Sequence, residues 1–312
     1  MSSMIATRDA YGETLAALGE ENENIVVLDA DLSGSTKTSL FAKKFPERFF
    51  NMGIAEANMI GTAAGLAAAG KIPFASTFAI FAVGRAWEQV RQSVAYPKAN
   101  VKIVATHSGV TVGEDGGSHQ SVEDIAIMRA VPNMTVIVPA DGIETALAVR
   151  AAAEFNGPVY VRLGRGKVPT IFTDSYRFAI GKGVQLRAGA DLTFIGTGLM
   201  TAQALLAADI LQKEGISARV LHIATVKPLD EELIIAAARE TGAVVTAEEH
   251  SIIGGLGGAV AELLSERCPV LMKRVGIKDR FGLSGKGDEL LKYFGLMPEN
   301  LVDAAKELLA RK

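Results

Sequence analysis

Short runs of apolar residues alternate with amphipathic stretches along most of the chain. In the first half, the runs predict strands at residues 25–29, 49–52, 72–75, 101–105, 135–138 and 158–162. The spacing of apolar positions between them predicts helices at residues 7–18, 55–69, 81–95, 122–130 and 142–154. Strands that alternate with helices favour a mostly parallel sheet with helices on both faces.

A second alternation occupies the end of the chain. It predicts strands at residues 192–195, 219–222, 243–247 and 270–275, and helices at residues 202–214, 230–240, 256–266 and 299–311. The stretch before it is weakly patterned and contains Pro169, Gly181 and Gly183, which indicates a connector. We therefore predict two three-layer α/β/α domains, at residues 1–168 and 188–312, joined by a linker at 169–187.

Composition and charge exclude several classes of function. A net charge of −3 over 312 residues gives no basic face for nucleic acid. No apolar run reaches membrane-spanning length, and residues 1–18 carry Arg8, Asp9 and Glu13 where a signal peptide needs an apolar core. Cys268 is the single cysteine, which excludes an internal disulfide and a thiolate metal site. We expect a soluble protein in a reducing, cytoplasmic setting.

One carboxylate stands out in the stretch 48–70, which reads RFFNMGIAEANMIGTAAGLAAAG. Nearly all of residues 52–70 are small or apolar, and Glu56 is the only charged residue among them. Desolvation is expected to raise the pKa of such a carboxyl group, so that it can hold a proton near neutral pH. The alternative is an acidic residue that merely favours the N-terminus of a helix beginning near Ala55.

A long polar loop follows the strand predicted at 101–105. Residues 105–121 read ATHSGVTVGEDGGSHQS and contain two of the four histidines, His107 and His119, together with Glu114 and Asp115. Loops at the carboxyl ends of parallel strands commonly form sites, and long ones are often functional. The histidines are too far apart for one helix face, so the loop is a poor metal site. The alternative is a solvated glycine loop whose histidines cap strand ends.

Three segments at the right order and spacing resemble the pyrimidine-binding domain of transketolases. They are NMGIAEANMIGTAAGLA at 51–67, STFAIFAVGRAWEQVRQ at 76–92 and THSGVTVGEDGGSHQSVED at 106–124. EEHSIIGGLGGAV at 248–260 resembles the family's C-terminal domain. The family's N-terminal domain, which binds diphosphate and a divalent metal through a Gly-Asp-Gly motif, has no counterpart in the sequence. The resemblance therefore implies the small subunit of a split transketolase.

The resemblance also implies an activity and a partner. Transketolases use thiamine diphosphate to transfer a two-carbon ketol unit from a ketose phosphate to an aldose phosphate, as in the pentose phosphate pathway. By this likeness, a partner subunit carries the diphosphate-binding domain and holds most of the contacts to Mg2+ or Ca2+. An α2β2 heterotetramer is implied, and the chain alone is expected to be inactive.

The resemblance assigns the cofactor's aminopyrimidine to one group of residues. Glu56 matches the acid that protonates the pyrimidine ring nitrogen, and His119 matches a histidine near the exocyclic amine; these two are the catalytic candidates. Phe81 matches the stacking aromatic, and Phe78 is expected to line the same pocket, although core packing is the alternative for such a pair. Asp31 is placed near the thiazolium ring.

A second group is assigned to the sugar phosphate. By motif position, Arg8, Ser35 and Arg165 match phosphate contacts of the family, and two guanidinium groups on one dianion are chemically suitable. Arg162 competes with Arg165 for this role, and the alternatives for Arg8 and Arg165 are a surface charge and a salt bridge at the domain junction. His107 matches a histidine at the phosphate end, and Asp115 a carboxylate that contacts a substrate hydroxyl.

Other functions share these two domains. The beta subunit of a 2-oxo acid dehydrogenase decarboxylase component would use an equivalent glutamate but no phosphate-binding arginines. A 1-deoxyxylulose-5-phosphate synthase would be similar, though that family keeps all its domains in one chain. A non-catalytic assembly subunit would not need Glu56, Phe81 and His119 together. The loop at 105–121 and the two arginines favour transketolase.

Overall fold

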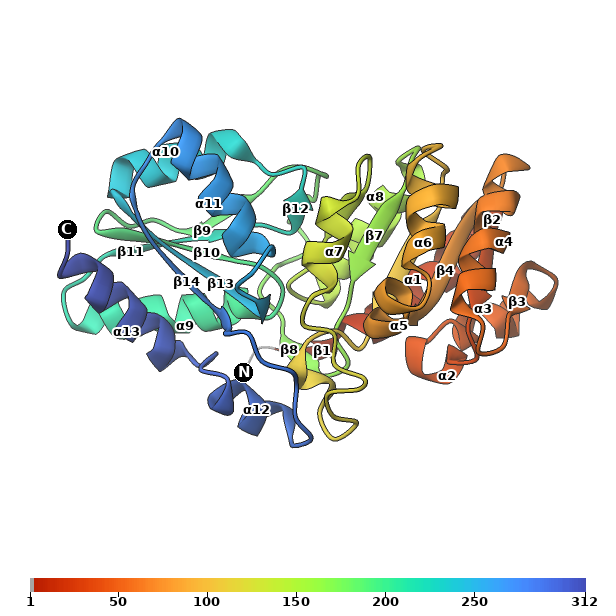
Figure 1. Ribbon diagram of the computed structural model, residues 1–312, viewed down its shortest axis with the longest axis horizontal. Coiled ribbons are helices and arrows are strands. Elements are labelled where there is room, and N and C mark those ends of the chain that lie inside the picture. Colours follow the sequence, from red (N-terminus) through yellow and green to blue (C-terminus); the bar gives the residue numbers. More distant parts are fainter. Residues whose placement is uncertain (1–2) are drawn as a thin grey trace.

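The computed structural model describes residues 3–312, in which two mostly parallel sheets lie side by side, each with helices on both faces (Figure 1). The first sheet has seven strands in the order β12-β6-β7-β5-β4-β2-β3. Its strands are β2 (Ile25–Asp29), β3 (Phe49–Asn51), β4 (Ile72–Phe78), β5 (Lys102–Thr106), β6 (Thr135–Ile137), β7 (Val159–Arg162) and β12 (Thr225–Lys227). All pair in parallel except β12, which runs antiparallel to β6.

Helices cover both faces of the first sheet. They include α1 (Thr7–Glu21), α4 (Glu56–Ala68), α5 (Ala79–Gly84), α6 (Trp87–Gln89), α7 (Asp124–Ala130) and α8 (Gly142–Glu154). Two short helices, α2 (Ser33–Thr36) and α3 (Ser39–Lys44), follow β2. A separate two-stranded sheet pairs β1 (Met4–Ala6) with β8 (Lys167–Pro169).

The second sheet has five strands in the order β14-β13-β10-β11-β9. They are β9 (Val184–Arg187), β10 (Leu192–Gly196), β11 (Ala218–His222), β13 (Ala243–Ser251) and β14 (Leu271–Ile277). Its helices are α9 (Met200–Lys213), α10 (Glu231–Thr241), α11 (Leu256–Arg267), α12 (Gly287–Tyr293) and α13 (Pro298–Leu309). The predicted α/β class with two layered units is therefore confirmed.

Several predicted elements need correction. The helix predicted at 81–95 is instead α5, α6 and a π-helical turn (Val90–Ala95), and Gly84, a weak helix former, ends the first piece. The strand predicted at 72–75 continues three residues further, because Ser76 is buried with its hydroxyl 2.7 Å from that of Tyr11. The predicted strand ends at Ala75, before two hydroxyl residues, but a partnered hydroxyl can lie inside a sheet.

The two sheets are interlocked. β12 lies beyond residue 188 in the sequence yet pairs with β6 of the first sheet, with Thr225 opposite Ile137. β9, inside the predicted connector, pairs with β11 of the second sheet. The limits drawn at 168 and 188 stay a prediction, but backbone pairing crosses between the sequence regions they separate.

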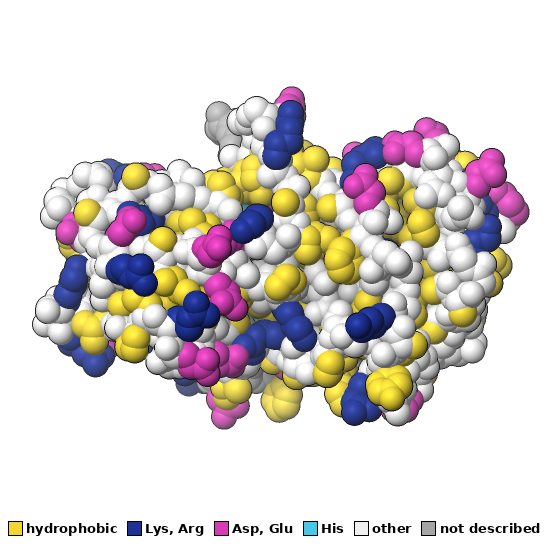
Figure 2. Space-filling model, turned by 90° about the horizontal axis from the view of Figure 1, so that it is seen from above, with side chains coloured by type: hydrophobic (Ala, Val, Ile, Leu, Met, Phe, Trp, Pro, Cys, Tyr) yellow, Lys and Arg dark blue, Asp and Glu magenta, His cyan; other side chains and the backbone are white. Residues whose placement is uncertain are grey.

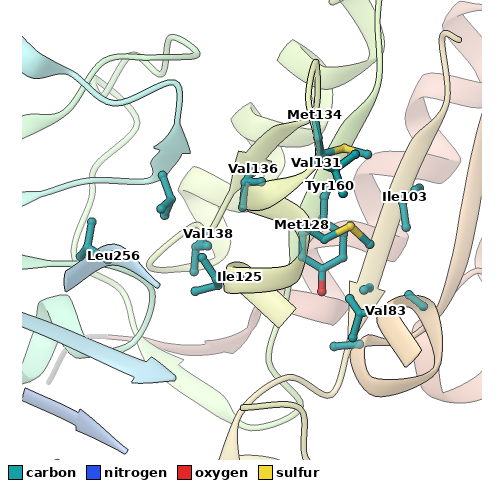
Figure 3. Packing of buried hydrophobic residues seen from close by; sticks show 14 of the residues in the cluster. Val83, Ile103, Ile125, Met128, Val131, Met134, Val136, Val138, Tyr160 and Leu256 are labelled. Carbon is teal, nitrogen blue, oxygen red and sulfur yellow. The ribbon is translucent and has the colours of Figure 1, made fainter. Parts of the chain in front are cut away.

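Apolar packing also crosses between the sheets. One cluster joins residues such as Ile125 and Val138 from the first sheet's layers to Leu221, Val244 and Leu256 from the second. Figure 3 shows part of this cluster, with Leu256 of α11 on the left and Ile125 and Val138 of the first sheet's layers to its right. The hydrophobic effect thus stabilises the arrangement of the two units relative to each other as well as each unit.

The surface shows no gathering of one charge sign on the face drawn in Figure 2, where acidic and basic side chains are interspersed. None of the helices among residues 3–312 combines the length and the apolar character needed to cross a membrane.

Lys102 is an unusual core residue at the start of β5. It is fully buried, and its ammonium group donates to the side-chain oxygen of Asn100 at 2.6 Å and to the backbone oxygens of Phe155 and Gly157 at 2.5 and 2.8 Å. Burial lowers the pKa of Lys102 to about 7. Through these three hydrogen bonds, the Lys102 side chain connects β5 to the loop before β7.

Replacing Lys102 by methionine should destabilise the protein by on the order of 1–3 kcal/mol, because the buried carbonyl group of Gly157 and the partly buried one of Phe155 lose their donor. Urea denaturation at neutral pH measures this loss, and the exposed Lys213 at the end of α9 provides the matched Lys→Met control. Equal midpoints for the two variants would contradict the connector role.

Candidate active site at the carboxyl edge of the first sheet

The predicted site residues gather where the strands of the first sheet end. The loops that follow β2, β3, β4, β5 and β7 all leave the sheet at its carboxyl edge, since these strands are parallel. These loops and the first turns of the helices after them carry the predicted residues Asp31, Ser35, Glu56, Phe81, His107, Asp115, His119 and Arg165. Arg8 joins them from the first turn of α1.

Glu56 is the first residue of α4 and is only 4% exposed, so the desolvated position predicted from its neighbours is confirmed. Its carboxylate is not alone. The Arg85 guanidinium donates a hydrogen bond from Nη1 to Oε1 at 3.0 Å. The sequence reasoning missed Arg85, whose position four residues after Phe81 was the only available signal.

Aromatic rings form a row beside this carboxylate. The imidazole of His107 stacks on Phe78 with 3.8 Å between ring centroids, and Phe78 stacks on Phe81 with 5.8 Å. His119 meets Phe81 edge-on at 5.5 Å, and the Arg85 guanidinium carbon lies 4.1 Å from the Phe81 centroid. Phe78 is only 6% exposed, so it supports its neighbours, whereas Phe81 is partly open.

His107 is held in a fixed tautomer. Arg8 can only donate, so its contact at 3.4 Å makes Nε2 of His107 the acceptor, and Nδ1 then donates to the Thr106 hydroxyl at 2.8 Å. Burial, with Arg8 and Arg165 nearby, lowers the pKa of His107 to about 3. The imidazole is therefore neutral at physiological pH and lies between the ring of Phe78 and a cation.

Two arginines converge near His107. Arg8 donates to the backbone oxygen of Ser35 at 3.1 Å, and burial together with the charge of Arg165 lowers the pKa of Arg8. Arg165 is half-buried, donates to the backbone oxygen of Val112 and lies 3.4 Å from the carboxylate of Glu114. Both arginines line a cavity of about 520 Å³ between the two domains, apart from Glu56 and Phe81.

The competing arginine, Arg162, is buried, and its guanidinium is hydrogen-bonded to groups inside the protein. Its Nε donates to Asp124 at 2.8 Å and its Nη2 to the backbone oxygen of Glu249 at 3.0 Å. Burial acts to lower the pKa of Arg162, but the charge of Asp124, the hydrogen bond to it and the charge of Glu249 together raise the pKa above its usual value. Of the two candidates, Arg165 has the more accessible guanidinium.

The loop after β2 is ordered by a buried acid. Asp29 accepts hydrogen bonds from the backbone of Leu32 and the hydroxyl groups of Thr36 and Thr38, and burial raises its pKa. Asp31 is exposed, has a positive φ of 64° and accepts from the side chain of Asn51 at 3.0 Å. The network around Asp29 thus shapes the loop that carries Asp31 and Ser35.

Hydrogen bonds from the second domain hold the long loop at 107–121 in place, and we call these bonds its braces. The Gln120 amide donates to Val110, Gly113 and Leu283 backbone oxygens, and Glu249 accepts from the backbone of Thr111 at 2.7 Å. The hydroxyl of Ser284 donates to the backbone of Glu114 at 2.6 Å. No periodicity in the sequence indicated these braces.

Two loop residues remain available to a ligand. Asp115 is exposed at the turn of the loop, and His119 is half-buried, with Nδ1 3.0 Å from the Ser118 hydroxyl. Within residues 3–312, no group of three or more histidine, cysteine or acidic side chains is placed to hold a metal ion.

The structure is thus an α/β protein with a buried acid and an aromatic cluster at the carboxyl edge of a parallel sheet. Residues 3–170 match the model of the transketolase pyrimidine-binding domain, and residues 181–301 match that of the transketolase C-terminal domain. The chain belongs to the transketolase family.

Relatives specify which part of a transketolase the chain corresponds to. It is 57% identical to a "putative transketolase C-terminal section" of Methanocaldococcus jannaschii, over 98% of this chain and 96% of that protein. It is 47% identical to a "6-deoxy-6-sulfo-D-fructose transketolase subunit" of a Clostridium species, over 98% and 95%. Human transketolase is 39% identical, but the chain spans only 49% of its length. The likeness to the C-terminal half of the family is confirmed.

A solved structure agrees with this assignment. A chain described as "split gene transketolase, inactive beta4 tetramer" superposes with a TM-score of 0.92 at 57% identity, over 98% of this chain and 99% of that chain. This chain therefore resembles the small-subunit half of a split transketolase over almost its whole described length.

Proposed function

We propose that the chain is the small subunit of a split, thiamine-diphosphate-dependent transketolase. The observation that carries this proposal is the buried carboxylate of Glu56, joined through Arg85 to the partly open ring of Phe81, which His119 meets edge-on. A carboxyl group held away from water can donate a proton to a neighbouring ring nitrogen and take it back.

The residues fit an aminopyrimidine. A flat group that carries N–H donors, the Arg85 guanidinium, already bonds to Glu56 while lying over Phe81. An aminopyrimidine is also flat, so the site accepts its shape. When bound, thiamine diphosphate supplies a carbanion that adds to the carbonyl group of a ketose.

Each residue then has a defined part. Glu56 holds the proton at the pyrimidine ring nitrogen, and Phe81 fixes the plane of the ring. Phe78 supports Phe81 from the interior, and His119 lies within reach of the exocyclic amine. Asp31 places negative charge near the positive thiazolium ring.

We assign Arg8, Arg165 and the Ser35 segment to the anionic end of the substrate. Two guanidinium groups suit a dianion, and the neutral His107 accepts from Arg8, so it orients that guanidinium without adding charge. We assign Asp115 to a substrate hydroxyl, and its exposure in the loop after β5 supports this. A sugar phosphate is our first candidate, and a sulfonated sugar is the second, because a 47% identical relative is named for 6-deoxy-6-sulfofructose.

We further propose that a partner chain carries the diphosphate-binding domain and the Mg2+ or Ca2+ ion, in an α2β2 assembly. Supporting this, one relative is named a C-terminal section and one structural neighbour is described as an inactive β4 tetramer. The active site would then be completed only at the junction of the two chains.

A reconstitution experiment tests the proposal. The purified chain is assayed alone and mixed with the diphosphate-domain polypeptide of the same organism, with thiamine diphosphate and Mg2+ present. We expect ketol transfer from xylulose 5-phosphate to ribose 5-phosphate only in the mixture, and parallel assays with 6-deoxy-6-sulfofructose rank the two donor classes. Transfer by the chain alone would overturn the split arrangement, and turnover of pyruvate instead of a ketose would overturn the transketolase assignment.

A further inference from the structure

Arg85 lies in the two-residue gap between α5 and α6, in contact with Glu56 and Phe81, two of the residues assigned to the aminopyrimidine. Its side chain is 52% exposed, whereas Glu56, to which it bonds, is 4% exposed. Its guanidinium therefore reaches from solvent onto a buried acid, with Nη1 3.0 Å from Oε1 and Cζ 4.1 Å from the centre of the Phe81 ring.

These two contacts are the ones that the proposed function gives to the aminopyrimidine, so the inference rests on that function. A flat ring stacked on Phe81 and bonded to Glu56 would need the volume that the guanidinium now fills. Phe78 and His119 already take other positions around Phe81. Arg85 and the pyrimidine ring therefore exclude each other.

We infer that Arg85 is a placeholder for the cofactor's pyrimidine ring. It covers Glu56 and Phe81 in the chain without cofactor and withdraws into solvent when the ring binds. A buried carboxylate without a partner is costly, so the guanidinium stabilises the chain while the site waits for its ligand. The open state is then a minor population, and the apparent affinity for the pyrimidine falls by the open fraction.

The structure allows this withdrawal. Among residues 3–312, Glu56 is the only hydrogen-bond partner of the Arg85 side chain, and half of that side chain is already in water. Gly84 precedes it, and a Cβ added there would meet no packed neighbour within 4 Å. Leaving the site thus breaks one ion pair and one cation–π contact, and disturbs no core packing.

Titration calorimetry with 4-amino-5-hydroxymethyl-2-methylpyrimidine tests the inference directly. This probe contains the pyrimidine half of the cofactor and needs neither phosphate contacts nor a partner chain. Arg85→Ala should bind it about tenfold more tightly than the natural chain, which corresponds to about 1.4 kcal/mol. Arg85→Lys keeps the charge but not the flat stacking group, so its affinity should lie between the two.

Arg91→Ala is the matched control, because Arg91 is an exposed arginine in the following π-helical turn whose side chain bonds to Gln92. Its affinity should equal that of the natural chain. The same shift is expected in the reconstituted enzyme, where Arg85→Ala should reach half-maximal activation at about one-tenth of the thiamine diphosphate concentration.

The possible results distinguish failure of this inference from failure of the proposed function on which it rests. If Phe81→Ala abolishes pyrimidine binding but Arg85→Ala leaves it unchanged or weaker, Arg85 is no placeholder and the pyrimidine site stands. If neither the natural chain nor Arg85→Ala binds the probe, and Phe81→Ala does not alter thiamine diphosphate binding by the reconstituted pair, both the placeholder and the proposed function are overturned.

Discussion

Glu56→Gln is expected to lower ketol transfer by the reconstituted enzyme roughly 10²- to 10⁴-fold, the range for loss of a positioned acid–base group. Glutamine has the same shape and its side-chain oxygen can still accept the bond from Arg85. It has no acidic proton to share with the pyrimidine ring. The loss should therefore appear in kcat rather than in the stability of the fold or in the binding of sugar.

Steady-state assays of the mixed subunits measure this effect, and thermal unfolding of the isolated chain checks the fold. Glu232→Gln is a suitable control, because Glu232 is 94% exposed on α10, and its activity should match the natural chain. Near-natural turnover by Glu56→Gln would remove the acid role from this residue and, with it, the main support for the proposed mechanism.

The position of Glu56 could be predicted because the relevant information is local. A single charge within a long run of small and apolar residues is buried in almost any compact fold that the run can adopt. The alternation of strands and helices likewise predicted which loops leave the same edge of the sheet. Those two facts place Glu56 and the loop of His107 and His119 at the carboxyl edge of the sheet, whereas the grouping with Phe81 came from the resemblance to transketolases.

Arg85 and the braces of the long loop could not be predicted in this way. The contact of Arg85 with Glu56 depends on the break between α5 and α6, whereas the sequence pattern favoured one continuous helix. Glu249 reaches Thr111 across 138 residues, and Ser284 reaches Glu114 across 170. Such pairings follow from how the two sheets interlock, through β12 above all, and periodicity within a segment carries no information about them.

These contacts also indicate that the second domain supports the loop that carries the predicted site residues. Gly117 lies so close to the backbone of Gly282 that an added Cβ would be 2.6 Å from its oxygen. The loop that carries Asp115 and His119 therefore packs directly on the segment before α12. We interpret the C-terminal domain as a support that holds the loop in the shape needed to receive a substrate.

Arg165→Ala should lower kcat/KM for xylulose 5-phosphate by roughly 10- to 150-fold, since a hydrogen bond to a charged group contributes about 1.5–3 kcal/mol. The effect should depend on the anion. With unphosphorylated xylulose, which has no dianion to bind, the variant and the natural enzyme should differ by only a few-fold, because the acid and the ring stack are intact.

The comparison of the two donors separates anion binding from a general effect on the loop. Arg165 also donates to Val112, so its removal could loosen residues 110–113, and that would slow both donors alike. Arg177→Ala, at an exposed arginine of the connector that bonds to the backbone of Asp174 and Tyr176, should leave both rates unchanged. An equal loss with phosphorylated and unphosphorylated donors would assign Arg165 to loop support, and the phosphate would then have to be bound by Arg8 with the neutral His107 beside it.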